Sequence, residues 1–301
     1  RYGLEGVSRK ELRSAMIITR GLVVTTSSRA GASEIERARK VASALNSPYI
    51  ERHSKSVAQV AKAAEVAREW PGPGKVEGVL VVESSRMTLV GMGQSGPAGP
   101  RLFFHPGMGP GRIRRAAQGR QDHMLEAMGL GRGDRVLDCT LGLASDAIVA
   151  AWAVGSSGKV VGIESSPALA EIVRAGLREY DKADPDTTDA MRRIEVVCAD
   201  HLMHLMSCPD QSYDVVYFDP MFREPVRLSP GIAGLRRWAC RSRLSGNAVR
   251  EATRVARRRV VIKDRSEGSE LDRLGVTMRL GGRGSRVEYG VICLTDEVTC
   301  R

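Results

Sequence analysis

The amino-acid sequence predicts an α/β fold built around a mostly parallel sheet. Strand-like apolar runs alternate with helical segments from Arg135 onward, a hairpin pattern follows them, and a separate α/β pattern precedes them. Alternating strands and helices favour a parallel sheet with right-handed crossovers. We therefore expect a Rossmann-like domain over residues 101–301, with an antiparallel C-terminal hairpin, and a small N-terminal α/β unit over residues 16–100.

The N-terminal unit combines short apolar runs with helical periodicity. Residues 1–15 precede Met16, which opens a cleaner apolar run, and we expect them to be an upstream extension. The Gly/Pro-rich stretch 93–100 is expected to act as the linker that closes the unit. The expected strands are 21–26, 76–84 and 86–91, and the expected helices are 32–45 and 56–69.

The larger domain shows a regular succession of elements. We expect a loop and then a helix within 103–130, and a polar loop over 181–189. Residues 275–280 and 286–294 flank the turn GGRGS, which predicts an antiparallel hairpin. The expected strands are 135–140, 159–164, 194–199, 213–218 and 260–264, and the expected helices are 145–154, 166–180, 201–206 and 246–257.

Composition limits the class of protein and its location. The 301 residues are 42% hydrophobic, which is enough for one large domain and a smaller one. Apolar runs are shorter than the ~20 residues that span a bilayer, and we expect neither a membrane segment nor a cleaved leader. Six scattered cysteines favour a reducing cytoplasm, and the five histidines lack the spacing of metal ligands, so we expect no metal.

An arginine-rich stretch carries most of the net charge of +11. Between Arg223 and Arg259 the chain has eleven arginines and two acids, so this stretch contributes nine of the eleven net charges. Such a cluster can bind a polyanion through phosphate contacts and counterion release. A solvated face and the codon usage of a GC-rich genome are the alternatives. The expected RNA-binding residues are Arg223, Arg227, Arg236, Arg237, Arg241 and Arg243.

Acidic residues follow three successive predicted strands. Asp138 is placed to bind an ammonium group, Glu164 to accept both hydroxyls of a ribose, and Asp200 to accept from an adenine amino group. The segment 138–146, DCTLGLASD, joins a strand to a helix as a nucleotide-binding loop does, and Gly142 allows close backbone approach. It lacks the GxGxxG of dinucleotide loops, which favours S-adenosylmethionine (SAM). Taken singly, each acid could instead be a turn or helix cap.

A fourth acid opens the segment Asp219-Pro220-Met221-Phe222, directly after the strand-like run YDVVYF. This segment resembles the (Asp/Asn)-Pro-Pro-(Tyr/Phe) motif of enzymes that methylate exocyclic amino groups of bases. The side chain of Asp219 and the carbonyl of Pro220 can accept hydrogen bonds from such a group and align its nitrogen with the methyl. Phe222 can stack on a flipped base. These three residues are the expected catalytic set, against the alternative of a strand-end turn with an apolar plug.

Together, DCTLGLASDA, GIESSP, CAD and YFDPMF resemble the RsmJ-like family of class I methyltransferases, which methylate the N2 amino group of a guanosine in small-subunit ribosomal RNA. The resemblance covers about residues 103–294, and 21–100 more weakly. It departs at Ser145, where the RNA enzymes have arginine. Matched by position, it implies further cofactor contacts at Ser145, Asp146, Ser165, Ala199 and Asp219. The full expected set is Asp138, Thr140, Gly142, Ser145, Asp146, Glu164, Ser165, Ala199, Asp200 and Asp219.

The resulting hypothesis is a cytoplasmic, SAM-dependent methyltransferase that acts on an exocyclic amino group in RNA, namely guanine N2 of ribosomal RNA. Its expected partner is the ribosomal RNA or the small ribosomal subunit. A DNA methyltransferase for adenine N6 or cytosine N4 shares the same chemistry, although no separate target-recognition domain is evident. A non-catalytic RNA-binding factor that retains the cofactor fold is the alternative from another class, and a nicotinamide dehydrogenase is a more distant one.

Overall fold

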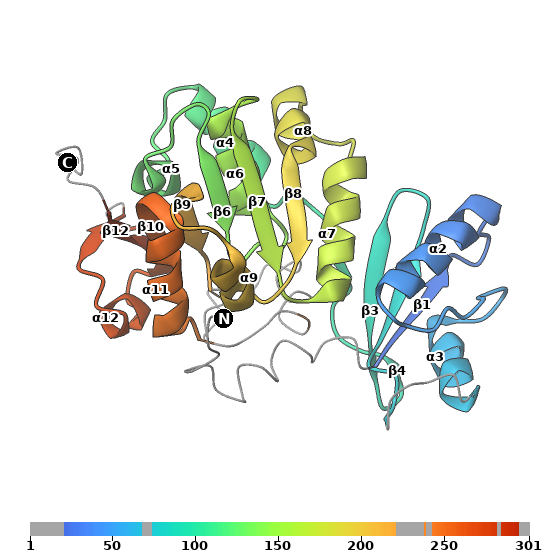
Figure 1. Cartoon of the computed structure of the whole chain (residues 1–301). Helices are drawn as coiled ribbons and strands as arrows, with labels where there is room; N and C mark the ends of the chain where they lie inside the picture. The colour runs from blue at the N-terminus through green and yellow to red at the C-terminus, as the bar shows by residue number, and fades with distance from the viewer. Residues whose placement is uncertain (1–20, 68–73, 221–237, 239–242, 282–283, 295–301) are drawn as a thin grey trace. The chain divides into compact units, whose positions relative to one another are not determined.

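The computed structural model describes residues 21–67, 74–220, 238, 243–281 and 284–294 (Figure 1). The chain divides into two compact units. The first comprises residues 1–104 together with 165–176 and 228–239, and the second comprises 105–164, 177–227 and 240–301. The first long segment ends at Phe104 instead of residue 100 because strand β5 (Leu102–Phe103) still pairs with the N-terminal sheet.

The first unit contains a five-stranded sheet. Strand β1 (Leu22–Thr26) runs parallel to β2 (Gly78–Val82), and β2 pairs antiparallel with β3 (Met87–Gly93), which confirms the predicted strand pair. The short strand β4 (Gly96–Pro97) also pairs with β3, so part of the Gly/Pro-rich stretch expected as a linker is a sheet hairpin. Helices α2 (Ala32–Ala44) and α3 (Val57–Val66) belong to this unit, as does most of α7 (Pro167–Glu179).

The second unit is built on a seven-stranded sheet with the order β11-β12-β10-β9-β6-β7-β8. Strands β8, β7, β6, β9 and β10 are parallel, whereas β12 is antiparallel to both β10 and β11, so the predicted C-terminal hairpin is confirmed. The strand order reverses between β6 and β9, and ligands of open α/β sheets bind at this switch point. The strands are β6 (Arg135–Asp138), β7 (Lys159–Glu164), β8 (Ile194–Cys198), β9 (Tyr213–Phe218), β10 (Ala256–Arg265), β11 (Met278–Leu280) and β12 (Val287–Cys293).

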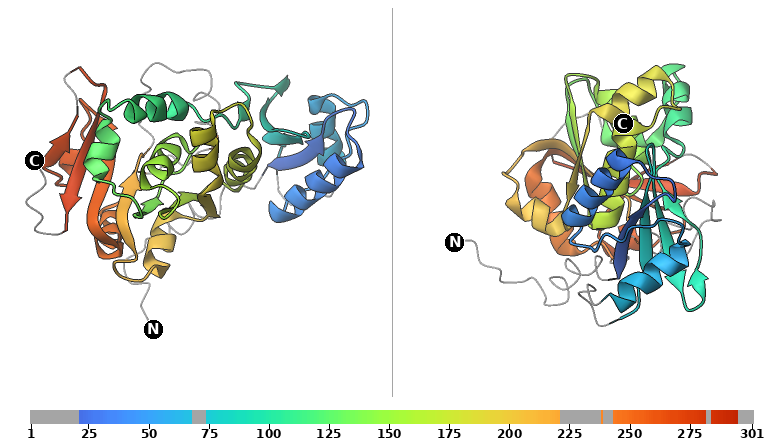
Figure 2. Two further views of the ribbon diagram at one scale, coloured as in Figure 1. Left: turned by 90° about the horizontal axis from the view of Figure 1, so that it is seen from above. Right: turned by 90° about the vertical axis from the view of Figure 1, so that its right-hand side faces the viewer.

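Helices cover both faces of this sheet (Figures 1 and 2). Helices α4, α5, α6 and α8 form one layer, and α9 and α11 pack on the other face against β7, β9 and β10. The second face buries the main apolar core, which includes Leu137, Val216, Phe218 and Ile262. The helices are α4 (Gly109–Ala117), α5 (His123–Met128), α6 (Ser145–Val154), α8 (Pro185–Arg192), α9 (His201–Ser207), α11 (Gly246–Val255) and α12 (Glu270–Arg273).

The polar loop predicted for 181–189 is wrong, because helix α8 begins within it at Pro185. Asp184 caps this helix by accepting a hydrogen bond from the Thr187 amide at 3.0 Å, and proline is well suited to the first helical turn. Met191 is fully buried, so packing supports the helix despite its polar sequence. Asp184 and Pro185, which are also typical of turns, therefore mark the start of a helix here.

The helix expected within 103–130 is divided into α4 and α5. Gly119, with φ +75°, turns the chain between them, and Asp122 caps α5 by accepting from the amides of Met124 and Leu125. Asp122 is thereby held at the face of the sheet that carries the polar side chains described below. None of the helices in the described ranges has the length and apolar character needed to cross a membrane.

Candidate active site

Four carboxylates lie at the carboxyl ends of neighbouring parallel strands. Asp138 ends β6 and Glu164 ends β7, while Asp200 and Asp219 follow β8 and β9 closely. Because the sheet order is β9-β6-β7-β8, their order along the edge is Asp219, Asp138, Glu164, Asp200. This row coincides with the switch point of the sheet, where an open α/β fold binds its ligand.

Two of these acids, Asp138 and Glu164, hold the loop between β6 and α6 in place. Asp138 accepts a hydrogen bond from the Thr140 amide at 2.9 Å, and Glu164 accepts from the Gly142 amide at 3.2 Å. The hydroxyl of Thr140 in turn accepts from the amide of Asp219 at 2.5 Å. These bonds tie the ends of β6, β7 and β9 together through one loop.

The first helix after this loop starts without a side-chain cap. Its N-cap residue is Ala144, in a left-handed conformation with φ +64°, and α6 begins at Ser145. The opening amide groups of a helix attract anions, and an alanine side chain cannot accept from them. Asp200 differs, because its Oδ1 caps α9 by accepting from the amides of Leu202 at 2.9 Å and Met203 at 3.1 Å. The proposed contact of Asp200 with adenine therefore has to coexist with this capping role.

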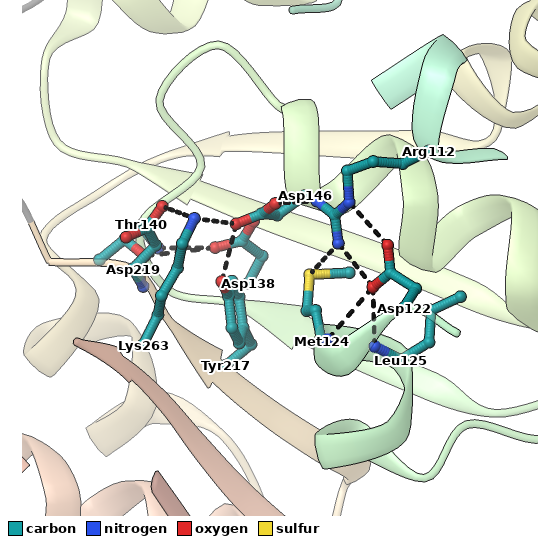
Figure 3. A network of polar contacts seen from close by, with 10 residues as sticks. All are labelled: Arg112, Asp122, Met124, Leu125, Asp138, Thr140, Asp146, Tyr217, Asp219 and Lys263. Atoms are coloured by element: carbon teal, nitrogen blue, oxygen red, sulfur yellow. Dashed lines mark hydrogen bonds and ion pairs between the residues drawn. The ribbon is translucent and has the colours of Figure 1, made fainter. Parts of the chain in front are cut away.

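A buried network of charges lies on the sheet face beneath α4, α5 and α6 (Figure 3). The Nζ of Lys263 lies 3.0 Å from an Asp146 oxygen and 2.8 Å from an Asp219 oxygen. Arg112 lies 2.5 Å from the other oxygen of Asp146 and 2.8 Å from Asp122. Tyr217 donates its hydroxyl hydrogen to Asp146 at 2.7 Å. The network therefore joins three helices to the ends of β9 and β10.

Burial and neighbouring charge shift the pKa values of this network in opposite directions. Burial alone would raise the pKa of Asp146, but Lys263 and Arg112 hold it well below its usual range. Burial raises the pKa of Asp138 to about 8, so this carboxyl holds a proton in much of the population at neutral pH. The pKa of Asp219 is also raised, first by its removal from water and then by Asp146, against the lowering influence of Lys263.

The sequence interpretation missed Arg112, Asp122, Tyr217 and Lys263. Lys263 lies in the apolar run VVIKD, and a charge in a buried strand requires a partner, so this signal was present in the sequence. Tyr217 and Asp219 alternate with the apolar Val216 and Phe218, as expected for two faces of one strand. Their partners are brought together only by the register of the sheet.

The structure brings together only part of the expected catalytic and RNA-binding sets. Asp219 and Pro220 follow β9, whereas Phe222 lies outside the described residues. Arg243 is described, and its guanidinium pairs with Glu270 at 3.1 Å. The remaining members of the RNA-binding set, namely Arg223, Arg227, Arg236, Arg237 and Arg241, also lie outside the described residues.

Arginines at the end of the arginine-rich stretch bind backbone carbonyls of the protein itself, so the whole stretch does not form one continuous surface for binding a polyanion. Arg254 donates to the carbonyls of Leu205 and Cys208 near the end of α9, at 2.8 and 2.9 Å. Arg258 and Arg259 donate to carbonyls at the end of α5, including that of Gly129 at 3.1 Å. Helix ends leave such carbonyls unpaired, which explains these contacts. These arginines lie at or before the start of β10, whereas Asp219 follows the opposite, carboxyl end of the parallel β9.

Comparison with known proteins decides the family. A model of the family described as "Putative SAM-dependent methyltransferase" matches residues 75–289. The chain belongs to this methyltransferase family. It is an enzyme whose cofactor is SAM, and the cofactor and fold expected from the sequence motifs are confirmed.

Several relatives show how far the similarity extends. The chain is 40% identical over 270 residues to "Uncharacterized protein YpiP" of Bacillus subtilis (strain 168), covering 90% of this chain and 98% of that protein. It is 29% identical over 237 residues to ribosomal RNA small subunit methyltransferase J of Dechloromonas aromatica (strain RCB), covering 77% and 94% of the two chains. The corresponding protein of Cellvibrio japonicus (strain Ueda107) is 34% identical over 158 residues, covering 50% and 58%. The RsmJ-like resemblance is thereby confirmed.

The fold is shared with a solved structure. The SAM-dependent methyltransferase NGO1261 from Neisseria gonorrhoeae aligns with a TM-score of 0.56 and 18% identity, over 90% of this chain and 95% of that one. The fold of this chain is thus similar to that of a solved methyltransferase.

The row of carboxylates has the chemistry that SAM requires. The cofactor carries an ammonium group, a ribose diol and an adenine amino group in succession, and carboxylates can accept hydrogen bonds from all three. Asp138 and Glu164 are 2% and 6% exposed, so both acceptors are largely removed from competing water. Among the described residues, no cluster of three or more metal-ligating side chains occurs.

Proposed function

We propose that this methyltransferase transfers a methyl group to an exocyclic amino group of a base in RNA, namely guanine N2 of small-subunit ribosomal RNA. The observation that carries the proposal is the position of Asp219-Pro220 at the end of β9, next to Asp138 and the loop 138–146. Two relatives that match this chain are named ribosomal RNA small subunit methyltransferase J, which supports the RNA target.

The proposed reaction depends on positioning. The lone pair of a base amino nitrogen is delocalised into the ring, which makes the nitrogen a poor nucleophile. Asp219 and the carbonyl of Pro220 would accept the two amino hydrogens, hold the nitrogen in line with the methyl group and stabilise the positive charge that develops on nitrogen. The proton then leaves to Asp219 or to solvent. Phe222 is proposed to stack on the flipped base.

The cofactor is proposed to lie along the row of carboxylates. Asp138 would bind its ammonium group, Glu164 its ribose hydroxyls and Asp200 its adenine amino group. Further residues are proposed to line the same site, namely Thr140, Gly142, Ser145, Ser165 and Ala199. Asp146 is proposed to support this site from the charged network, because its oxygens are bound by Arg112, Lys263 and Tyr217. SAM supplies the electrophilic methyl group when bound.

The RNA is proposed to be bound by the first part of the arginine-rich stretch, from Arg223 to Arg243. Since Arg254, Arg258 and Arg259 are bound to carbonyls at helix ends, we assign phosphate binding to the arginines that precede them. We propose a cytoplasmic location for the enzyme, because the relatives named as ribosomal RNA methyltransferases are bacterial proteins. An RNA affinity that declines steeply with salt would accompany this mode of binding.

The decisive experiment is methyl transfer from labelled SAM to ribosomal RNA isolated from cells that lack the gene, followed by mass spectrometry of the nucleosides. The expected product is N2-methylguanosine at one position of the small-subunit RNA. Asp219→Ala should reduce turnover at saturating cofactor by ~10²–10³-fold, the loss seen when a preorganised transition-state partner is removed.

Other products would contradict this proposal in distinct ways. Methylated adenine N6 or cytosine N4 in DNA, with unmodified RNA, would identify the DNA enzyme. Cofactor binding without transfer to either nucleic acid would show that the methyl acceptor belongs to another class of molecule. Full turnover by Asp219→Ala at saturating cofactor would exclude the amino-group mechanism even if RNA is the substrate.

A further inference from the structure

We propose that Lys263 is the residue that holds Asp219 in place and in its charged form for methyl transfer, an inference that rests on the proposed role of Asp219. Lys263 acts through Asp219 and is therefore a positioning residue. Its ammonium group lies at the edge of the sheet where the four carboxylates gather, although it belongs to β10, which carries none of them.

The register of the sheet brings Lys263 to this position. Ile262 of β10 is paired with Phe218 of β9, so Lys263 and Asp219 are the next residues along the two parallel strands. Side chains alternate between the faces of a strand, and Ile262 and Phe218 face the apolar core, which directs Lys263 and Asp219 to the other face. The 2.8 Å contact between Nζ and Oδ2 is the result.

The two carboxylates that share Lys263 differ in their other partners. Asp146 also binds Arg112 at 2.5 Å and accepts from Tyr217 at 2.7 Å. For Asp219, Lys263 is the cation within salt-bridge distance among the residues that the structure describes. Removal of the Lys263 charge therefore leaves Asp146 paired with Arg112, whereas Asp219 loses the cationic partner that the structure describes for it. The effect should concentrate on Asp219.

The exposure of the pair also fits a role in the reaction. The side chain of Lys263 is 17% exposed and that of Asp219 is 31% exposed, so Asp219 is accessible to a substrate while Lys263 is largely covered. Removing a carboxylate from water raises its pKa, and a nearby ammonium lowers it again. Lys263 thus counteracts part of the effect that burial has on the pKa of Asp219, and a carboxylate is a better acceptor for an amino group than a protonated carboxyl.

The test compares Lys263→Met and Lys263→Arg with the wild-type enzyme. Lys263→Met should lower the single-turnover rate at saturating SAM by ~10–100-fold, the loss found when partners that orient metal ligands are removed. Lys263→Arg keeps the charge and should recover part of the rate. Lys159→Met is the matched control, because Lys159 pairs with Glu195 at 2.8 Å on the same sheet, outside the network. The control should keep the wild-type rate.

A double-mutant cycle separates this role from general structural support. If Lys263 acts through Asp219, adding Lys263→Met to Asp219→Ala should cause no further loss of rate. An equal loss in both backgrounds would overturn the inference, as would a folded Lys263→Met enzyme with the wild-type rate. Melting temperatures of all variants, measured on the same preparations, identify any effect that is due to unfolding.

The pH profile provides a second readout. Lys263 lowers the pKa of Asp219, so its removal should move the acidic limb of the rate profile to higher pH. An unshifted limb would contradict the inference. The charged and titratable groups that face this pair are Asp138 from β6, Asp146 from α6, Tyr217 from β9 and Tyr289 from β12, while Arg112 from α4 lies beyond Asp146.

A readout that is independent of activity distinguishes failure of this inference from failure of the proposed function. The carboxyl resonance of Asp219, assigned by its loss in Asp219→Asn, can be titrated by carbon-13 NMR in the wild-type and Lys263→Met proteins. A higher pKa of Asp219 in Lys263→Met supports the electrostatic link even if the RNA product differs from the proposed one. An unchanged pKa overturns it even if the product is N2-methylguanosine.

Discussion

Replacement of Glu164 provides a sharp test of the cofactor site. Glu164 ends β7, is 6% exposed, and holds the Gly142 amide at 3.2 Å. In the proposed complex its carboxylate also accepts from the ribose hydroxyls of SAM. Glu164→Ala removes both functions, whereas Glu164→Gln retains a neutral acceptor at the same position. Comparison of the two variants therefore separates the contribution of charge from that of shape.

The magnitude follows from these contacts. A hydrogen bond to a charged group contributes ~1.5–3 kcal/mol, and loss of one such bond to the ribose corresponds to ~10–150-fold weaker binding. Glu164→Ala should lie in this range, and Glu164→Gln should lose about tenfold or less because a neutral hydrogen bond remains. The unpaired amide of Gly142 should also lower the stability of Glu164→Ala by about 1–3 kcal/mol.

Isothermal titration with S-adenosylhomocysteine, well below the melting temperature of each variant, measures the affinity. Glu195→Ala is the control, because Glu195 is an exposed acid on the neighbouring strand β8 that pairs with Lys159. The control should bind as the wild type does. Affinity of folded Glu164→Ala within about twofold of the wild-type value would refute the assignment of the ribose to Glu164.

Two further predictions concern the buried charges. Because burial raises the pKa of Asp138 to about 8, binding of the cofactor's ammonium group should ionise this carboxyl and release a proton near pH 7, and cofactor affinity should rise as the pH rises toward 8. Calorimetric titration in buffers of different ionisation enthalpy measures the proton release. No release, or an unchanged release in Asp138→Asn, would contradict the assignment of the ammonium group to Asp138. Arg112→Met leaves Asp122 and Asp146 without this partner and should lower the free energy of unfolding by ~3–5 kcal/mol, measured by urea unfolding. The control Arg86→Met removes an exposed arginine and should lower it by less than ~1 kcal/mol. Equal losses of stability in the two variants would show that the network is not important for stability.

Much of the fold was predictable because its signals are local. The run KVVGIE predicts β7 with its observed bounds, and Ser145–Val154 is a helix as expected. The acids at the strand ends could be placed at one edge because parallel strands share their direction. Helix α8 was missed because Asp184 and Pro185 are typical of turns as well as of helix starts, and the buried Met191 that decides between them depends on tertiary packing.

The charged network could not be assembled from the sequence alone. Its pairs are separated by 10 to 117 residues along the chain, and their contact depends on sheet register and on the placement of α4 against α6. The arginine-rich stretch shows the opposite difficulty. A run of like charges suggests one binding surface, yet Arg254 and Arg258 are engaged by carbonyls at helix ends. Local composition indicated the charge but not which guanidinium groups were available.

The antiparallel insertion of β12 has a consequence for biosynthesis. Strand β10 pairs with β9 on one side and with β12 on the other, and Tyr289 of β12 lies opposite Lys263. A nascent chain released only as far as β10 would present that strand as an unpaired edge, which is a template for wrong pairing with other chains. The strand that completes the surroundings of Lys263 is synthesised after every acid in the row along the sheet. The row of carboxylates is therefore synthesised first, and β12, which pairs with β10 beside Lys263, is synthesised last.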